Sequence, residues 1–162
     1  MDVKQINEKE LSDHLEFFSR DRELRLLARE VKIGAYKLDA VAADPSGALV
    51  VVELKVNASI ATLGQLLLYP HVLRKAICRC GVRPPRVRAL LITTFLDSNV
   101  KEVVHKLADK VDIEFLVCTG ATPDSLRLVD PENAGEEQCW DQSKRGSSKL
   151  KPVLAYLSAG SN

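Results

Sequence analysis

The 162-residue sequence has almost no net charge, because 23 Lys and Arg residues balance 22 Asp and Glu residues to a formal +1 at pH 7. A protein that coats nucleic acid by bulk charge would be far more basic. The hydrophobic and charged contents, 46% and 28%, exclude a disordered, collagenous or coiled-coil chain. The composition therefore predicts a globular protein, and a nucleic-acid partner would have to bind a local patch.

Cysteine and long apolar runs are also scarce. The four cysteines are too few and too irregularly spaced for a disulfide scaffold. Cys78-Arg79-Cys80 lacks the two-residue spacer of a zinc knuckle, and the three histidines are scattered. No segment reaches the roughly 18 apolar residues of a membrane span, and the charged N-terminus lacks the apolar stretch of a signal peptide. We expect a soluble, cytoplasmic protein with no membrane partner.

The apolar periodicity alternates between helical and strand-like segments. The expected elements are a helix over 3–18, strands over 25–33, 36–43 and 48–56, a helix over 60–80, a strand over 87–94, a helix over 99–110, and strands over 113–118 and 126–129. Pro70 is expected to kink or divide the long helix. This order predicts an α/β fold with a mixed central sheet flanked by helices, over residues 1–130. Residues 131–162 are polar and form a predicted C-terminal extension, partly flexible.

Three charged residues interrupt two adjacent apolar strands. Glu53 and Lys55 lie in the most hydrophobic strand, and alternate residues of a strand project from one face. A register that pairs the strands across the turn at 44–47 brings Asp39 near Glu53. Two charges in so apolar a strand need a compensating reason. We therefore expect two carboxylates and an ammonium group to converge at one edge of the sheet.

Such a set of groups can bind a hard cation. The Asp39 and Glu53 carboxylates and the backbone carbonyl of Leu54 offer oxygen ligands for Mg²⁺, for which Mn²⁺ can substitute. A bound metal lowers the pKa of its water and neutralises charge at phosphorus. Lys55 would orient that water and stabilise the charge of the transition state. The alternative is a salt bridge between Glu53 and Lys55 on an edge strand, because short patterns of this kind recur by chance.

Further polar residues share a helix face with these elements. Gln65 and Tyr69 stand four residues apart in the long helix, where they either reach the metal site or nucleic acid, or form the polar edge of a buried helix. Glu8 is in register with the apolar stripe of the first helix that begins at Leu11. It is either an additional acid at the site or a carboxylate favoured by the helix dipole.

Together these residues resemble the PD-(D/E)XK nuclease superfamily, through Asp39, Glu53-x-Lys55 and Gln65-x-x-x-Tyr69. The last element is like the RecB-type branch, and residues 6–118 are similar to the nuclease domain of NucS-type mismatch endonucleases. The resemblance implies a restriction-endonuclease-like fold with an αβββαβ core. It also implies that Asp39 and Glu53 are metal ligands, Lys55 the catalytic lysine, Glu8 the acid of the first helix, and Gln65 and Tyr69 an accessory pair. The separate N-terminal domain of NucS-type enzymes is not matched, so mismatch specificity is not implied.

A local basic patch compensates for the neutral net charge. Residues 54–96 contain seven Lys and Arg residues and no Asp or Glu, so the rest of the chain has 16 basic and 22 acidic residues. Besides Lys55, the basic residues follow the middle of the long helix and are Arg74, Lys75, Arg79, Arg83, Arg86 and Arg88. Such a patch can neutralise phosphates without reading sequence. The alternative is a solvated helix end, where cations suit the dipole.

The sequence as a whole predicts a metal-dependent DNA endonuclease that hydrolyses phosphodiester bonds with a Mg²⁺-activated water. Because compact nuclease domains usually cut both strands of a duplex as dimers, we expect a homodimer. Two alternatives remain open, a catalytically silent nucleic-acid-binding module of the same fold and a nuclease directed at RNA.

Overall fold

The computed structural model describes residues 6–107, 110–120, 125–134 and 139–140, in which seven strands form one mixed sheet. Six strands follow one another in the order β1-β2-β3-β4-β5-β6, and β7 pairs with β4. The elements are α1 (Glu8–Asp13), α2 (Leu15–Asp21), β1 (Arg25–Ile33), β2 (Tyr36–Ala43), β3 (Leu49–Ala58), α3 (Ile60–Arg79), β4 (Val87–Asp97), α4 (Ser98–Leu107), β5 (Ile113–Thr119), β6 (Arg127–Val129), the 3-10 helix η2 (Pro131–Asn133) and β7 (Cys139–Trp140).

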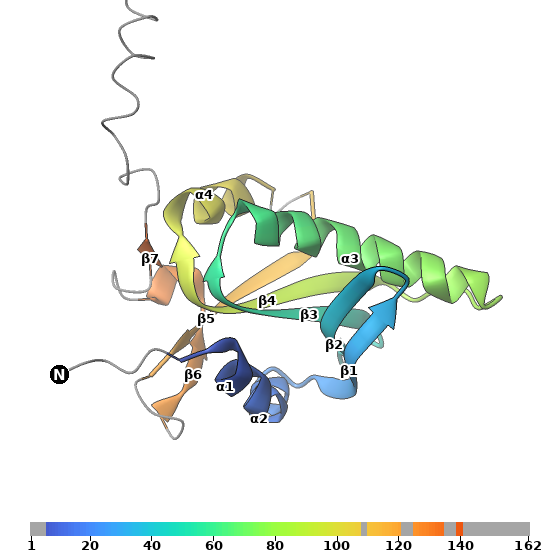
Figure 1. Cartoon of the computed structure of the whole chain (residues 1–162), viewed down its shortest axis with the longest axis horizontal. Coiled ribbons are helices and arrows are strands. Elements are labelled where there is room, and N and C mark those ends of the chain that lie inside the picture. The colour runs from blue at the N-terminus through green and yellow to red at the C-terminus, as the bar shows by residue number, and fades with distance from the viewer. Residues whose placement is uncertain (1–5, 108–109, 121–124, 135–138, 141–162) are drawn as a thin grey trace, which may run out of the picture.

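The sheet separates two helical layers (Figure 1). The short helices α1 and α2 cover one face, where Leu11, Leu15 and Phe18 pack with alternate residues of β3 such as Val50 and Val52. Helices α3 and α4 cover the other face. Alternate residues of one strand thus pack in an apolar core on each face of the sheet, as expected for a sheet that is buried on both sides.

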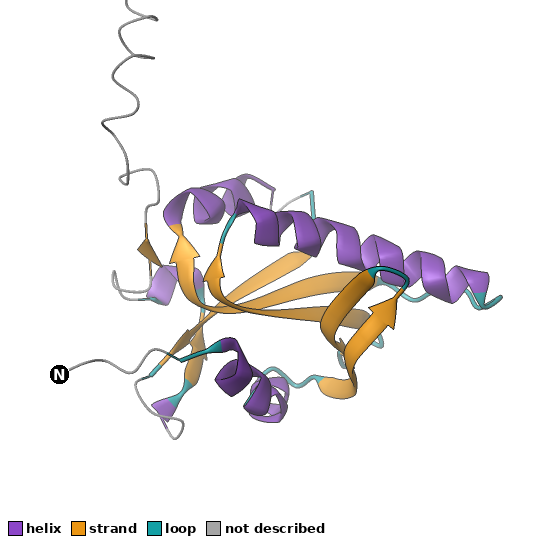
Figure 2. Cartoon of the chain, viewed as in Figure 1, coloured by secondary structure: helices purple, strands orange, loops and turns teal. Residues whose placement is uncertain are grey.

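The connections explain the mixed character of the sheet (Figure 2). Strands β1, β2 and β3 form an antiparallel meander joined by tight turns, the second at Asp44–Gly47. Strands β3, β4 and β5 are parallel and are connected by α3 and α4, because a parallel pair needs a crossover. The predicted α/β architecture is confirmed, and the observed strand bounds lie close to the predicted ones.

The predicted first helix over 3–18 is wrong as a single element. A capping box between Asn7 and Glu10 starts α1 at Glu8, and the helix ends at Asp13. At His14 the backbone N–H donates to the carbonyls of Glu10 and Leu11, and the ring bonds the Glu10 carbonyl at 2.8 Å. A second helix then starts at Leu15. The apolar stripe continues across this break, which is why periodicity alone did not reveal it.

The predicted division of the long helix at Pro70 is also wrong. Helix α3 runs without a break over 20 residues, with Ser59 as its N-cap residue and Gly81, at a φ of +76°, after its C-terminus. Pro70 cannot donate to the carbonyl four residues earlier. Buried side chains on both sides of it, Leu66, Tyr69 and Leu73, pack in the apolar clusters against the sheet and keep both halves of the helix on it.

Two elements of the predicted extension belong to the described residues. The 3-10 helix η2 starts at Pro131, and β7 pairs with the end of β4 through Leu96 and Asp97. The prediction for the remainder of the extension lies outside the described residues. Within the described part of the chain, no helix has both the length and the apolar character needed to cross a membrane.

An ion-pair network ties the β2–β3 turn to the parallel strands. The Arg88 guanidinium on β4 donates to Asp44 at 3.1 Å and to Glu114 on β5 at 3.0 Å, and Arg22 pairs with the same glutamate. Asp44 also accepts hydrogen bonds from the Ser46 hydroxyl at 2.6 Å and from the backbone N–H groups of Ser46 and Ala48. These bonds, that of the Ser46 hydroxyl foremost, lower the pKa of Asp44 to about 2.

The low pKa of Asp44 predicts a loss of stability in acid. A carboxylate whose pKa is lower in the folded than in the unfolded state stabilises the fold above the unfolded value of about 4. That contribution is lost as the pH falls from about 4 to about 2. Urea unfolding at pH 6, 4 and 2.5 should show a smaller acid-induced loss for Asp44→Asn than for the wild type. Asp13→Asn, at an exposed site in α1, is the control, and parallel pH curves for Asp44→Asn and the wild type would refute the prediction.

Candidate active site

The two predicted carboxylates meet where β2 and β3 run side by side. The antiparallel register pairs Ala40 with Val52, so Asp39 and Glu53 occupy the next positions across the two strands. The Asp39 carboxylate accepts a hydrogen bond from the backbone N–H of Leu54 at 2.8 Å. This bond holds the Asp39 side chain against β3, as the predicted register requires.

Glu53 is buried to an unusual degree for a carboxylate. Its side chain is 2% exposed, and its Oε2 atom is buried without a hydrogen-bond partner among the residues that the structure describes. Burial, followed by repulsion from Asp39, raises the pKa of Glu53 to about 7, although Lys55 opposes the shift. A buried acceptor without a donor is costly in a structural role, which argues against a simple surface salt bridge.

Lys55 completes the cluster from the same strand. Its Nζ atom lies 3.2 Å from Glu53 Oε1 and 4.0 Å from Glu8 Oε1. Burial lowers the pKa of Lys55, but Glu53, Asp39 and Glu8 together outweigh burial and raise it above its ordinary value. Lys55 is therefore a permanent cation here, suited to stabilising negative charge rather than to accepting a proton.

Glu8 lies at the start of α1, and its carboxylate is exposed to solvent. The contact with Lys55 places this first-helix acid at the edge of the cluster, as the sequence predicts. The Lys55 ammonium group lies between the Glu8 carboxylate, at 4.0 Å, and Glu53 Oε1, at 3.2 Å. Helix α1 thus contributes an exposed carboxylate beside Lys55.

Gln65 and Tyr69 lie on one face of α3, as their spacing predicts. The Gln65 side-chain amide donates to the Tyr69 hydroxyl at 3.1 Å, and Tyr69 is 7% exposed. The structure joins these two residues to each other, and no hydrogen bond of the described residues joins them to Asp39, Glu53 or Lys55. Their accessory role therefore stays a prediction.

The donor set fits a hard divalent cation in part. Asp39 and Glu53 supply carboxylate oxygens, and the unpaired Glu53 Oε2 is the kind of buried acceptor that a cation would satisfy. In the described residues, no group of three or more His, Cys, Asp or Glu side chains converges on a possible metal position. A cation here would need the Leu54 carbonyl, water or a substrate oxygen as further ligands, which suits Mg²⁺.

The predicted phosphate-binding residues divide into two groups. Arg74, Lys75, Arg79 and Arg83 are exposed on the C-terminal part of α3 and the loop after it. These four side chains have no ion pair with the residues that the structure describes. In Figure 1 the end of α3 that holds most of them projects past the β1–β2 hairpin, so this end is open to a large partner.

Arg86 and Arg88 are instead paired within the fold. Arg86 bonds Asp112 at 2.6 Å, and Arg88 is held by Asp44 and Glu114, with its side chain 16% exposed. These acids come from the β2–β3 turn, from the segment before β5 and from β5 itself. Arg88 thus has ion-pair partners within the fold, and its phosphate contact stays a prediction.

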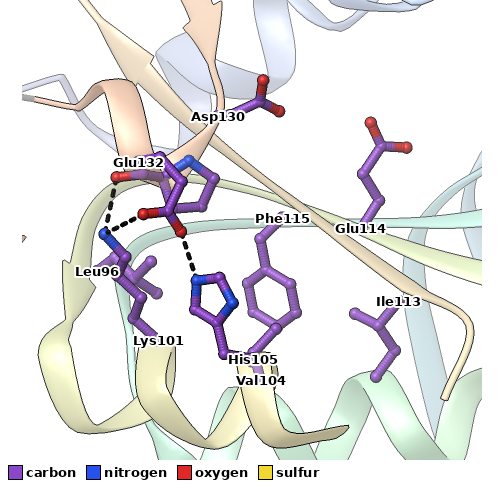
Figure 3. Close-up of a pocket in the computed structure, with 10 residues that line it drawn as sticks. Leu96, Lys101, Val104, His105, Ile113, Glu114, Phe115, Asp130 and Glu132 are labelled. Atoms are coloured by element: carbon purple, nitrogen blue, oxygen red, sulfur yellow. Dashed lines mark hydrogen bonds and ion pairs between the residues drawn. The ribbon is translucent and has the colours of Figure 1, made fainter. Parts of the chain in front are cut away.

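A separate cavity of about 240 Å³ lies between α4, β5 and η2 (Figure 3). Its floor is apolar and includes Phe115. Three of its polar side chains pair with one another, because Lys101 lies 3.5 Å from Glu132 and His105 also pairs with that glutamate. The cavity is lined by none of the residues that the sequence singled out as a site.

One residue that contacts Tyr69 was not singled out from the sequence. Tyr36 begins β2, three residues before Asp39, and its ring meets that of Tyr69 at an angle of 65° with centroids 6.3 Å apart. Aromatic residues are common in strands, so nothing in the sequence separates Tyr36 from other strand aromatics. Its exposure is visible only in the structure.

Comparison with solved structures identifies similar folds in repair endonucleases. A repair endonuclease from Pyrococcus abyssi matches with a TM-score of 0.51 and 22% identity, over 68% of this chain and 46% of that one. EndoMS in complex with double-stranded DNA matches with a TM-score of 0.51 and 26% identity, over 68% and 44%. Apo EndoMS matches with a TM-score of 0.51 and 24% identity, over 72% and 49%. The chain has the restriction-endonuclease-like fold.

The resemblance to PD-(D/E)XK nucleases is thus confirmed at the level of the fold. The chain spans less than half the length of these three proteins. No protein-family model matches the sequence, and no curated protein matches it.

Proposed function

We propose that the protein is a magnesium-dependent DNA endonuclease that hydrolyses phosphodiester bonds. The observation that carries the proposal is the cluster of Asp39, Glu53 and Lys55 on two adjacent strands, with Glu53 buried and one of its oxygens unpaired. The similarity in fold to repair endonucleases, one of them in complex with double-stranded DNA, supports the same class of substrate.

The residues have separate tasks in this proposal. Asp39 and Glu53 hold the cation, and the Leu54 N–H keeps Asp39 in place while the Leu54 carbonyl offers a further ligand. A bound Mg²⁺ would lower the pKa of a water and neutralise charge on the phosphate. Lys55, kept protonated by its acidic neighbours, orients the attacking water and stabilises the charge that grows in the transition state.

The exposed basic residues of α3 and its following loop, Arg74, Lys75, Arg79 and Arg83, bind the DNA backbone in this proposal. Each phosphate contact releases counterions, so affinity should fall steeply with salt and carry no sequence information. Contact with both strands of a duplex would favour two copies acting together. A homodimer is part of the proposal and is tested by sedimentation in the presence and absence of DNA.

Metal binding and cleavage are tested together. The wild type should cleave DNA with Mg²⁺ or Mn²⁺ and should bind Mn²⁺ in calorimetric titration. Asp39→Asn should weaken Mn²⁺ binding at least about tenfold, a loss typical even of residues that only support a metal ligand. The exposed Asp130→Asn is the matched control. Mn²⁺ binding that does not depend on Asp39 would refute the site.

The choice of substrate distinguishes the rival functions. Single-stranded, duplex, mismatched and branched DNA should be compared with RNA of the same sequence. Cleavage of RNA alone would redirect the proposal to an RNA nuclease. Binding of DNA without cleavage, together with no metal binding, would identify a silent module of the same fold.

A further inference from the structure

Glu30 has an unusual backbone conformation for a residue in the middle of a strand. Its φ is +49°, in the left-handed region that residues with a side chain rarely adopt. The residues on either side of it pair with Ala40 and Leu38 of β2, so its place in the register is opposite Asp39. A left-handed residue bends a strand, and strained backbone of this kind clusters at functional sites. The bend in β1 therefore falls across from a candidate metal ligand.

The pairing of β2 with β3 ends at the same place. It stops at Ala40 and Val52, whereas β2 stays paired with β1 as far as Tyr36. Beyond Ala40, toward the turn of the hairpin, β2 thus follows β1 and leaves β3. Asp39 is the first residue of β2 past this point.

The diverging end of the β1–β2 hairpin packs on α3. Leu38 is fully buried in one apolar cluster with Tyr69 and Leu73 of α3. In Figure 1 this end of the hairpin lies against α3 and away from α1. The packing holds the bend, because the exposed ion pair of Glu30 with Lys37, at 2.5 Å, contributes little.

The Asp39 carboxylate lies in the gap that opens between the strands. It accepts the Leu54 N–H at 2.8 Å, and Leu54 lies two residues past the last residue of β3 that pairs with β2. A side chain of β2, rather than its main chain, thus satisfies this N–H. In return the Asp39 backbone N–H donates to the Glu53 carboxylate, which opposes the larger effect of burial on the pKa of Glu53. The two candidate ligands therefore meet where the ladder is open.

We propose that Glu30 is a positioning residue of the metal site. Its left-handed backbone bends β1 and the part of β2 paired with it, so that the Asp39 carboxylate enters the gap beside β3 and reaches a cation held with Glu53. In a straight hairpin the β2–β3 ladder would continue past Asp39, and its carboxylate would stand out from the sheet instead. This inference rests on the proposed function, since it concerns the divalent cation bound by Asp39 and Glu53.

The test separates the backbone conformation at position 30 from the charge of its side chain. Glu30→Gly accepts a left-handed backbone without strain, whereas Glu30→Val disfavours it strongly because its side chain is β-branched. Lys37→Met removes the ion pair alone. Glu23, before β1, has a φ of +54° and is also exposed, so Glu23→Val is a matched control for the same strain at another position. Mn²⁺ affinity is measured by calorimetric titration at a temperature at which thermal melting shows every variant to be folded.

The expected result is a loss of metal affinity that depends on the backbone alone. Glu30→Val should bind Mn²⁺ at least about tenfold more weakly than the wild type, a loss typical of residues that support a metal ligand. In an Asp39→Asn background Glu30→Val should have little further effect, because Glu30 acts through Asp39. Mn²⁺ binding should not weaken in the variants that keep a left-handed backbone at position 30, namely Glu30→Gly, Lys37→Met and Glu23→Val.

Three results would overturn the inference. Equal Mn²⁺ affinity for Glu30→Val and the wild type would make the bend a matter of folding alone. Equal weakening by Glu30→Gly and Glu30→Val would assign the effect to the side chain, and equal weakening by Glu23→Val would assign it to a general loss of stability.

These outcomes are distinct from a failure of the proposed function. Mn²⁺ binding and metal-dependent cleavage by the wild type would leave the nuclease proposal intact in all three, whereas a wild type that binds no Mn²⁺ would overturn both. Glu30→Thr, which is also β-branched but more polar, takes the place of Glu30→Val if the latter is unfolded at the temperature of the titration.

Discussion

Replacing Glu53 by Gln or Lys55 by Met is expected to lower the rate of DNA cleavage by about a hundredfold to a thousandfold. Glu53→Gln removes a charged ligand of the proposed cation, and loss of such electrostatic stabilisation typically costs factors of about 10² to 10³ for a single donor. Lys55→Met keeps the aliphatic stem but removes the cation that faces Glu53 and Glu8. The rates are measured in single-turnover cleavage assays with Mg²⁺.

A matched control is available in another part of the chain. Lys101 and Glu132 form an ion pair at 3.5 Å beside the cavity between α4 and η2 (Figure 3). Lys101→Met and Glu132→Gln change the same residue types in the same way and should leave the cleavage rate within about twofold, as surface ion pairs contribute little. Wild-type rates in the Glu53 and Lys55 variants would show that the cluster is not catalytic.

The same Glu53→Gln exchange is expected to stabilise the fold in metal-free buffer. The pKa of Glu53 is raised to about 7 from an ordinary value near 4.5, chiefly by burial. An acid whose pKa is raised by folding contributes its full stability below the unfolded value, and that contribution is lost as the pH rises through about 7. At pH 8 the Gln variant should exceed the wild type in the free energy of unfolding by about 2–3 kcal/mol.

Chemical denaturation in EDTA at pH 8 and at pH 4 measures this effect. At pH 4 the difference should disappear, because the wild-type carboxyl is then neutral in the folded state. Added Mg²⁺ should raise the stability of the wild type at pH 8 more than that of the variant, as a ligand stabilises the state that binds it. A variant less stable than the wild type at pH 8 without metal would contradict the assignment of Glu53 as a strained functional carboxylate.

The buried Glu53 carboxylate is expected to support cleavage and, without a bound metal, to lower the stability of the fold. Functional residues often violate the rules that govern a stable fold, here the rule that buried charges are fully paired. The sequence indicated this violation, since Glu53 and Lys55 interrupt an otherwise apolar strand. Only the structure identified the atom that is buried without a hydrogen-bond partner among the described residues, the Oε2 of Glu53.

The strand order was predictable because local patterns determine it. Turn residues at Gly34-Ala35 and at 44–47 impose tight hairpins, and the length of the 60–80 segment requires a helical crossover to a parallel strand. The break at His14 and the continuity at Pro70 were not predictable in this way. Both depend on which side chains pack on the sheet. The periodicity of apolar residues is the same for one continuous helix and for two consecutive helices.

For the predicted basic patch, too, the sequence did not reveal which residues have partners in distant parts of the chain. Residues 54–96 contain no Asp or Glu, so the sequence suggested no ion-pair partner for any cation in that segment. Arg86 and Arg88 find acids in distant parts of the chain, Asp112, Asp44 and Glu114, because parallel strands bring those segments to the same end of the sheet. Exposed cations such as Arg79 remain on α3 and the following loop, where they form no ion pair with any acid in the described part of the chain.

By itself the sequence determined the α/β class, the pairing of the two charged strands and the residue types that meet at their edge. These follow from alternation, turn chemistry and chain length, which act over short distances along the chain. The tertiary structure alone decided that Glu53 is buried with one oxygen unpaired among the described residues and that Arg88 is held by acids of two other segments. Burial and charge pairing depend on neighbours that are remote in sequence, so they are set only when the layers of the fold come together.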